Sequence, residues 1–521
     1  MMASPFHPRR RVRASFGFAV TASLLALLTG CAQYAEQLAP ESPNEPWQQG
    51  RKTTVSLLPQ DPASSQQGPQ QRDFAVRGNP ELTVLPPAPE VRAGKAYQLP
   101  ELIDLAARNN PTTRVAWEQA RQAALAVGIA ESTFLPTISA NVIGGSQQIT
   151  TPVDVLGVRK DIETNVSGAT TAVALQWLVF DFGQRKAAAD VAKHVLTAAN
   201  VNFNGAHQLL IFNVTRTYYQ YGAAQTRTEV AGQSLRNSRA ILEAAVAREK
   251  KGIGTTVEVA QARQQAAQSE LRQVVAQGQE RDAYQALLAA MSVSPTLNIK
   301  VANSGRRRLP APADVSTDEM IQQALARRPD VLASYANMKA GEAGINVANA
   351  DFLPKVFLSG VAGQGTSGFN TAGLPTIGQQ GSGAGVLVGA TMPIYDGGLR
   401  AANLKAAESR AAVARATFAK TQEEAVREMV VASNTLRSAL ASYRAASKLT
   451  DAAAITYDAA LDAYRNGLGT VTAATVADSG LLDARQARAD AHAASLVAAA
   501  NLAFVLGAMT SPRAGETLSY R

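Results

Sequence analysis

The sequence contains an internal duplication, and this feature limits the possible folds more than any other. The tripeptide Phe-Leu-Pro at 134–136 recurs at 352–354, a shift of 218 residues. Gly-Ile-Gly-Thr at 252–255 recurs as Gly-Leu-Gly-Thr at 467–470, a shift of 215 residues. Chance does not keep separate anchors in the same order at nearly one offset. The body of the chain is therefore predicted to be two tandem copies of one structural unit.

The segments around the two copies differ from them in composition. Ten prolines fall between Pro40 and Pro89, so the stretch before the first copy is expected to be an extended tether. The expected segments are a signal peptide (1–30), the tether (31–97), repeat 1 (98–295), an inter-repeat linker (296–315), repeat 2 (316–511) and a C-terminal tail (512–521).

Each copy is predicted to contain two kinds of helix. A first helix of about twenty-five residues occupies 111–136 or 329–354, because a proline lies near its start and another proline interrupts the backbone hydrogen bonds at its end. Much longer helices follow, since 184–294 and 394–511 contain no proline. A helix from Gln184 to about Lys250 would be roughly 100 Å long. Helices of this length suit a tube that spans a wide compartment better than a globular domain.

Between the helices, each copy is predicted to contain two strands. Apolar residues at 138, 140 and 142 alternate with polar ones, which is typical of a strand with one face in lipid. A loop rich in glycine, serine and threonine is expected at 145–170 and at 361–384, followed by second strands at 172–178 and 386–392. Four strands are too few to close a barrel around a lumen, and an open sheet would leave two unpaired edges in lipid. Several chains must therefore share one barrel.

The N-terminus reads as an export signal. Four arginines among residues 9–13 precede an apolar run at 16–28 that is too short to span a bilayer. The run ends in Leu-Thr-Gly before Cys31, which resembles the bacterial lipobox and predicts lipidation of this cysteine. The alternative is a buried thiol, but Cys31 is the sole cysteine and follows the apolar run directly. Ala32 after it, rather than aspartate, favours sorting to the outer membrane.

Composition argues against several functional classes. Loss of the four signal arginines, with no acid lost, lowers the net charge from +9 to +5, which does not indicate nucleic-acid binding. His194, His207 and His492 are isolated on predicted helices without cysteine or carboxylate spacing suited to a metal. No catalytic constellation is found either, so we expect no enzymatic activity, no metal and no cofactor beyond the covalent lipid.

Together, these features resemble the TolC-like outer membrane factor family of outer membrane efflux proteins, in its lipoprotein branch. The resemblance rests on the lipobox, the tandem helix-strand-strand-helix order, the Phe-Leu-Pro before each first strand, the Asp-Phe-Gly or Asp-Gly-Gly after each second strand, and the glycine-marked hairpin tips. It covers about residues 98–511. It implies an α+β membrane protein: a homotrimer with one 12-stranded β-barrel on a long α-helical coiled-coil barrel.

The resemblance also implies a function, partners and a location. The expected protein is a passive exit duct of a tripartite efflux or type I secretion system, lipid-anchored in the outer membrane and extending into the periplasm. Its expected partners are a periplasmic adaptor and an inner-membrane pump, with no nucleic acid. The cargo could be a drug, a metal or a protein, because the wall of a wide duct is poorly selective.

The two predicted hairpin tips are the first candidate sites. Their glycines and threonines suit a tight helix reversal, with glycine in left-handed geometry and threonine as the next cap. The resemblance additionally implies docking of an adaptor hairpin at these tips. The residues are Gly252, Ile253, Gly254 and Thr255 in the first copy and Gly467, Leu468, Gly469 and Thr470 in the second.

Two acids after the tips are the candidate pore residues. Glu258 and Asp478 match family positions that line or latch the periplasmic aperture, and three copies of one acid around a narrow pore would attract cations. The alternative is a solvated helix face. Asp181 and Asp396, before glycine at the strand-to-helix junctions, are expected to cap the long helices.

A second function from another class is a structural coiled-coil lipoprotein that tethers the outer membrane across the periplasm. Such a tether would explain the lipid and the long helices. It would not explain two amphipathic strand pairs at matching places in the repeats.

Overall fold

The computed structural model describes residues 79–80, 91–92, 94–155, 157–305, 307–310, 317–371 and 375–509. The chain divides into two units, residues 1–87 and 88–521, and the helices and strands named below belong to the second. The predicted signal peptide, Cys31, most of the tether and the tail at 512–521 lie outside the described residues. No helix within the described ranges combines the length and the apolar character that a membrane crossing requires.

The two copies fold alike, and their three larger helices have identical lengths. Each copy has a first helix of 22 residues, a long helix of 67 residues and a returning helix of 35 residues. The bounds are α3 Pro111–Ser132, α4 Gln184–Lys250 and α5 Thr256–Ala290 in the first copy, and α7 Pro329–Ala350, α8 Leu399–Arg465 and α9 Val471–Val505 in the second. The predicted helix from Gln184 to Lys250 is thereby confirmed, whereas the first helices end a few residues earlier than expected.

One antiparallel sheet joins the copies in the order β2-β3-β5-β6. Its strands are β2 Thr137–Val155, β3 Val158–Phe180, β5 Lys355–Thr371 and β6 Ile377–Thr391. The loops expected at 145–170 and 361–384 were wrong, because most of these residues belong to the paired strands. Glycine is uncommon in strands, because it has no side chain to pack against its neighbours. Here the paired strands approach each other closely at Gly168 and Gly363, where an added Cβ would clash with the neighbouring backbone.

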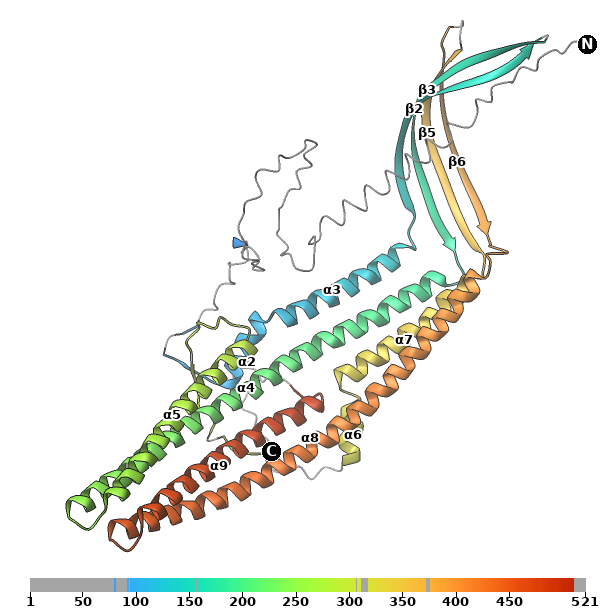
Figure 1. The fold of residues 1–521 in the computed structure, drawn as a ribbon. Coiled ribbons are helices and arrows are strands. Elements are labelled where there is room, and N and C mark those ends of the chain that lie inside the picture. The colour runs from blue at the N-terminus through green and yellow to red at the C-terminus, as the bar shows by residue number, and fades with distance from the viewer. Residues whose placement is uncertain are drawn as a thin grey trace, which may run out of the picture. The chain divides into compact units, whose positions relative to one another are not determined.

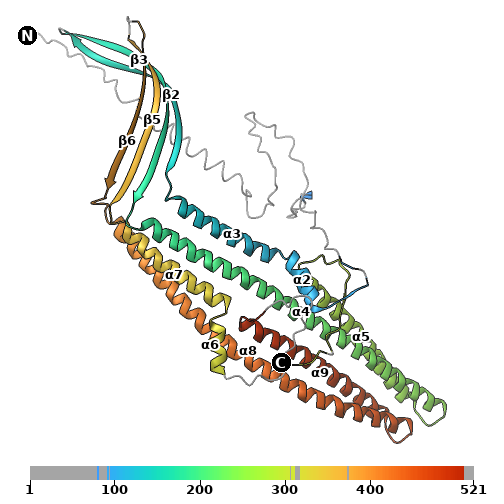
Figure 2. The ribbon, with the colours of Figure 1, turned by 180° about the vertical axis from the view of Figure 1, so that it is seen from behind.

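The long helices form two hairpins, α4–α5 and α8–α9, which lie side by side with both tips at the end away from the sheet (Figure 1). The view from behind gives the same arrangement (Figure 2). Near the tips, an apolar cluster fills the space between the hairpins, with Ile241 and Ala245 from α4, Tyr464 from α8 and Leu481 from α9. The hairpins of one chain are thus packed against each other along their tip halves.

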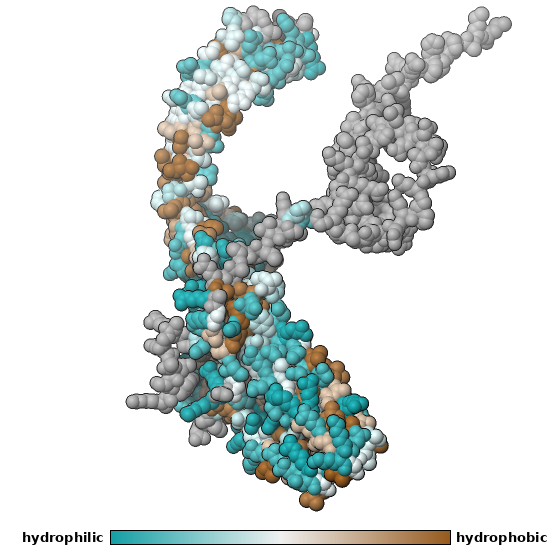
Figure 3. Space-filling view, turned by 90° about the vertical axis from the view of Figure 1, so that its left-hand side faces the viewer, coloured by the Kyte–Doolittle hydropathy of each residue, from teal (hydrophilic) through white to brown (hydrophobic). Residues whose placement is uncertain are grey.

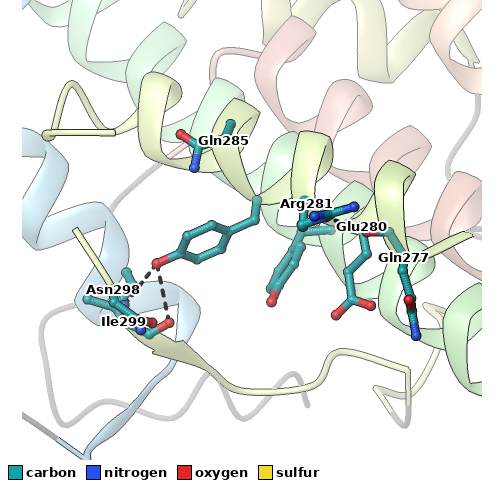
Figure 4. A pocket seen from close by; sticks show the side chains of 8 residues that line it. Gln277, Glu280, Arg281, Gln285, Asn298 and Ile299 are labelled. Carbon is teal, nitrogen blue, oxygen red and sulfur yellow. Dashed lines mark hydrogen bonds between the residues drawn. The ribbon is translucent and has the colours of Figure 1, made fainter. Parts of the chain in front are cut away.

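Short elements surround the middle of the helices. They are α2 Leu99–Asn109, α6 Thr317–Leu325 and a two-stranded parallel sheet of β1 Ala96–Tyr97 and β4 Lys300–Val301. The linker after α5 is fixed by Tyr284, whose hydroxyl donates to the carbonyl of Leu297 and accepts the N–H of Ile299, both at 2.8 Å. In Figure 4, linker residues Asn298 and Ile299 face the helix that carries Gln277 and Gln285. The described part of the linker is therefore held against the helices.

The junctions between strand and long helix are built alike in the two copies. Asp181 accepts hydrogen bonds from the backbone N–H groups of Gly183 and Arg185, and Arg185 Nε returns to the same carboxylate at 2.8 Å. Asp396 makes the equivalent bonds with Gly398 and Arg400. These contacts confirm the predicted capping and satisfy N–H groups that have no partner inside the helix.

Candidate functional site

The first tip is a tight reversal between α4 and α5. Gly252 takes a left-handed conformation at φ +72° and donates its N–H to the carbonyl of Glu249. The hydroxyl of Thr255 then accepts the N–H of Glu258 at 3.2 Å and caps α5. Ile253, between these two features, is 62% exposed. The turn chemistry expected at this tip is confirmed.

The second tip repeats this geometry between α8 and α9. Gly467 has φ +79°, and the hydroxyl of Thr470 accepts the N–H of Ala473 at 3.2 Å. Gly469 comes so close to the end of α8 that a side chain there would press on Tyr464 and Ala463. Leu468 is 87% exposed. Each tip therefore presents one large apolar side chain to its surroundings.

Arg248 connects the two tips. Its Nη1 donates to the carbonyl of Tyr464 at 3.2 Å and its Nη2 to the carbonyl of Ile253 at 3.1 Å. The guanidinium also lies over the Tyr464 ring, 5.2 Å from its centroid. Bidentate donation by a planar guanidinium orients both acceptors. Arg248 therefore fixes the C-terminal end of α8 relative to the first tip.

Sequence reasoning missed both Arg248 and Tyr464. The available signals were an arginine in the last turn of α4, where a cation is favoured by the helix dipole, and a tyrosine three residues before the second tip. Neither signal reveals that the two residues meet, because the meeting depends on how the hairpins pack.

Glu258 lies in the first turn of α5 and is partly buried. Within the described residues, its buried Oε2 and the buried hydroxyl of Tyr464 both have no hydrogen-bond partner. Burial raises the pKa of Tyr464, the charge of Glu258 raises it further, and Arg248 opposes the shift. Glu258 thus belongs to a polar cluster with Arg248 and Tyr464, and its pore role stays a prediction.

Asp478 is buried, whereas an acid that lines a pore is expected to be exposed. Asp478 is 1% exposed, and its carboxyl faces α4 from α9. Asn237 Nδ2 donates to its Oδ1 at 2.9 Å, and Ser234 Oγ donates to its Oδ2 at 3.1 Å. Burial raises the pKa of Asp478, and the two hydrogen bonds oppose the shift only in part. Burial and this nearby carboxyl also raise the pKa of Tyr457 to about 12.

An acidic ring at Asp478 would need this carboxyl to face a lumen, whereas in the protomer it faces α4. The physical reason is its place in the helical repeat. Val471, Ala474 and Leu481 are the other buried members of the same stripe of α9. Asp478 is therefore a buried polar contact between the hairpins of one chain, and the expectation of an exposed ring at this position is corrected.

The amino-acid sequence resembles those of known proteins. The model of a family described as outer membrane efflux protein matches residues 102–293 and 320–508. OpmQ of Pseudomonas putida, named a pyoverdine export outer membrane protein, is 29% identical over 286 residues, which are 54% of this chain and 60% of OpmQ. Protein CyaE of Bordetella pertussis is 27% identical over 262 residues, covering 50% of this chain and 53% of CyaE. The chain thus spans between half and two thirds of the length of these relatives.

The fold also matches solved structures. The outer-membrane channel OprN superposes with a TM-score of 0.65 at 22% identity, over 79% of this chain and 90% of OprN. A CusC structure, described as showing transmembrane channel formation, gives a TM-score of 0.66 at 20% identity, over 79% of this chain and 92% of CusC. These likenesses establish the tandem-repeat α+β architecture.

Proposed function

This chain belongs to the outer membrane efflux protein family, and from that premise we propose that it is the outer-membrane exit duct of a tripartite efflux or type I secretion system. The duct is a passive conduit, and a pump in the inner membrane supplies the energy. Three copies form the duct, each contributing four strands to one barrel and two helical hairpins to one tunnel. Lipidation of Cys31 anchors the chain in the outer membrane.

One observation carries the proposal: the same chain contains a sheet with two open edges and a pair of long helical hairpins. Within the described residues, β2 and β6 are the edge strands of the four-stranded sheet, and neither pairs with a further strand on its outer side. Open edges of this length in lipid would leave a row of backbone groups without partners. Copies of the chain that pair β2 with β6 remove these edges, and the 67-residue helices then continue the tube away from the sheet.

The tips are proposed to dock the periplasmic adaptor. Ile253 and Leu468 are exposed at the ends of the hairpins, and large apolar side chains at a rigid turn are suitable anchors for a partner helix. The cargo is proposed to be set by the pump, because the wall of a wide duct makes few specific contacts with what passes through it.

The test of the duct is the electrophoretic and electrical behaviour of the purified, lipidated protein. We expect a trimer that runs as one band without heating and dissociates on boiling, together with discrete conductance steps in planar bilayers. A structural tether would give neither heat-modifiable migration nor conductance. Heat-labile trimers without any conductance, even after the tip glycines are replaced to loosen the helical end, would contradict the duct.

A further inference from the structure

The two faces of the sheet differ in polarity, and the register assigns each side chain to one of them. Residues paired across neighbouring antiparallel strands point to the same face, and successive residues alternate. Ile138, Leu175 and Val386 share one face near the helices, and Ser139 and Asn141 lie on the other. Under the proposed function, on which this inference rests, the first is the lipid-side face and the second the lumen-side face.

Toward the outer end of the sheet, away from the helices, the lumen-side face carries several large apolar side chains among polar ones, and Lys160 lies beside Val153 on this face. Phe369 pairs with Val166 on one side and with Ile377 on the other. Further out, the alternation places more apolar residues on this face of β2 and β3. Ile149, Phe369 and Ile377 are 41%, 38% and 66% exposed in the protomer. We call this set the apolar rim: Ile149, Val153, Ile162, Val166, Phe369 and Ile377.

At the same level, the lipid-side face becomes charged. Glu163 pairs with Thr150, and Arg159 pairs with Asp154. Asp161, between them on the same face, is exposed. On the face drawn in the space-filling view, hydrophobic residues gather over the middle of the sheet and give way to hydrophilic ones at its outer end (Figure 3). Lipid is therefore not the occupant of the apolar rim, because the rim points away from the face that carries Arg159, Asp161 and Glu163, which is the lipid-side face.

The apolar rim of each copy is instead expected to contact the apolar rims of the other two copies. A barrel of twelve tilted strands is roughly 25 Å across. Among the residues that the structure describes, 158–163 of β3 pair only with β2, so a two-stranded ribbon extends beyond the last β3–β5 pair at Thr164 and Thr371. Six residues of strand reach about 20 Å, which is more than the radius of the barrel. The end of the β2–β3 ribbon also turns away from the course of β5 and β6 (Figure 1).

The part of the sheet beneath the apolar rim can bend toward the lumen. Its lumen-side face carries glycine on every strand, so fewer side chains resist curvature toward that face. The strands already approach closely there, because an added Cβ at Gly168 would clash with the carbonyl of Thr366. These glycines are Gly145, Gly168, Gly363, Gly365, Gly381 and Gly383.

We propose that the apolar rims of three copies converge at the outer mouth of the duct and form a hydrophobic seal. An apolar constriction excludes water and ions unless it is pushed open. The mouth is thereby closed to small polar solutes at rest and opens when cargo separates the ribbons. The charged lipid-side residues keep the converged ribbons in water rather than in the membrane.

The experiment measures access to the lumen from outside the cell. Ala172 lies on the lumen-side face below the apolar rim, paired with Asn141 and Gly363. In Ala172→Cys, a membrane-impermeant thiol reagent added to intact cells reaches this cysteine only through the mouth. We expect slow labelling in the otherwise native chain and labelling at least tenfold faster when Ile162→Ser and Phe369→Ser are added. The chain without Ala172→Cys gives the background from Cys31.

The matched control changes the neighbouring residues that point to the other face. Asp161→Ser and Asn370→Ser, added to Ala172→Cys, are expected to leave the labelling rate unchanged. Equal, fast labelling with the native rim and with the serine variant would overturn the seal, as would an equal acceleration by the control pair. Each sample is also run unheated on a gel. Absence of the heat-labile trimer in the parent protein would contradict the proposed duct itself, whereas intact trimers with an unrestricted mouth would contradict only the seal.

Discussion

At the scale of single residues, the buried carboxyl of Asp478 makes the contact between α4 and α9 sensitive to pH. Its pKa is raised by burial, so the folded state favours the protonated form. The stability that this group contributes is fully present below its unfolded pKa and is lost as pH rises through the raised folded pKa. Acidic conditions therefore strengthen this contact, while a pH above the raised pKa leaves a charge in a site where Ser234 and Asn237 donate the hydrogen bonds.

We predict that Asp478→Asn stabilises the protein relative to the parent by an amount that grows as pH rises above the ordinary aspartate range. The amide is neutral at every pH and has the same shape. The measurement is the thermal unfolding midpoint by circular dichroism from pH 4 to pH 8. Asp483→Asn, an exposed position on the same helix, serves as the control and should shift the midpoint little. Parallel curves for the parent and Asp478→Asn would mean that Asp478 titrates like an exposed acid.

At the scale of elements, the hairpin tips combine rigidity with exposed apolar side chains. The backbone of each tip is fixed by a left-handed glycine and a threonine cap, and Arg248 fixes one tip to the other. Ile253 and Leu468 are therefore held in place before any partner arrives, and preorganisation of this kind lowers the entropy that binding must overcome.

We predict that Leu468→Asp weakens docking of the adaptor by about tenfold, which corresponds to about 1.4 kcal/mol. A buried apolar anchor would be replaced by a charge without a partner. The measurement is affinity for the periplasmic adaptor together with export in cells. Thr456→Asp adds the same charge on the exposed side of the α8 shaft and should leave both unchanged. Loss of the trimer in Leu468→Asp would instead assign this residue to assembly.

The sequence predicted helices more accurately than strands, and the reason is physical. The ends of α4 and α8 are marked by Gly-x-Gly and threonine, which force a reversal whatever the tertiary context. The outer halves of β2 and β5 contain glycine, serine and threonine, whose strand conformation depends on pairing with a neighbour that local sequence does not identify. Asp478 was misassigned for a related reason: a charge was given more weight than its position on the buried stripe of α9.

At the scale of the whole molecule, the assignment of the two sheet faces determines how three chains would share a barrel. The row of Ala140, Val173, Ala362 and Ala384 lies in the middle of the apolar lipid-side band, and Ala174 lies one residue away on the opposite face. Val173 is 51% exposed in the protomer. Exposure of this apolar row is stable only in contact with lipid.

Our last prediction uses these two neighbours, because Val173→Arg and Ala174→Arg add the same charge to the same strand and differ only in the face that receives it. Arginine on the lipid-side face costs about 2–4 kcal/mol near the bilayer centre, so Val173→Arg should strongly reduce the heat-labile trimer in the outer membrane. Ala174→Arg should assemble normally and shift the selectivity of the conductance toward anions, since three cations would line the lumen. The reverse pattern would exchange the two faces, and with them the direction in which the apolar rim points.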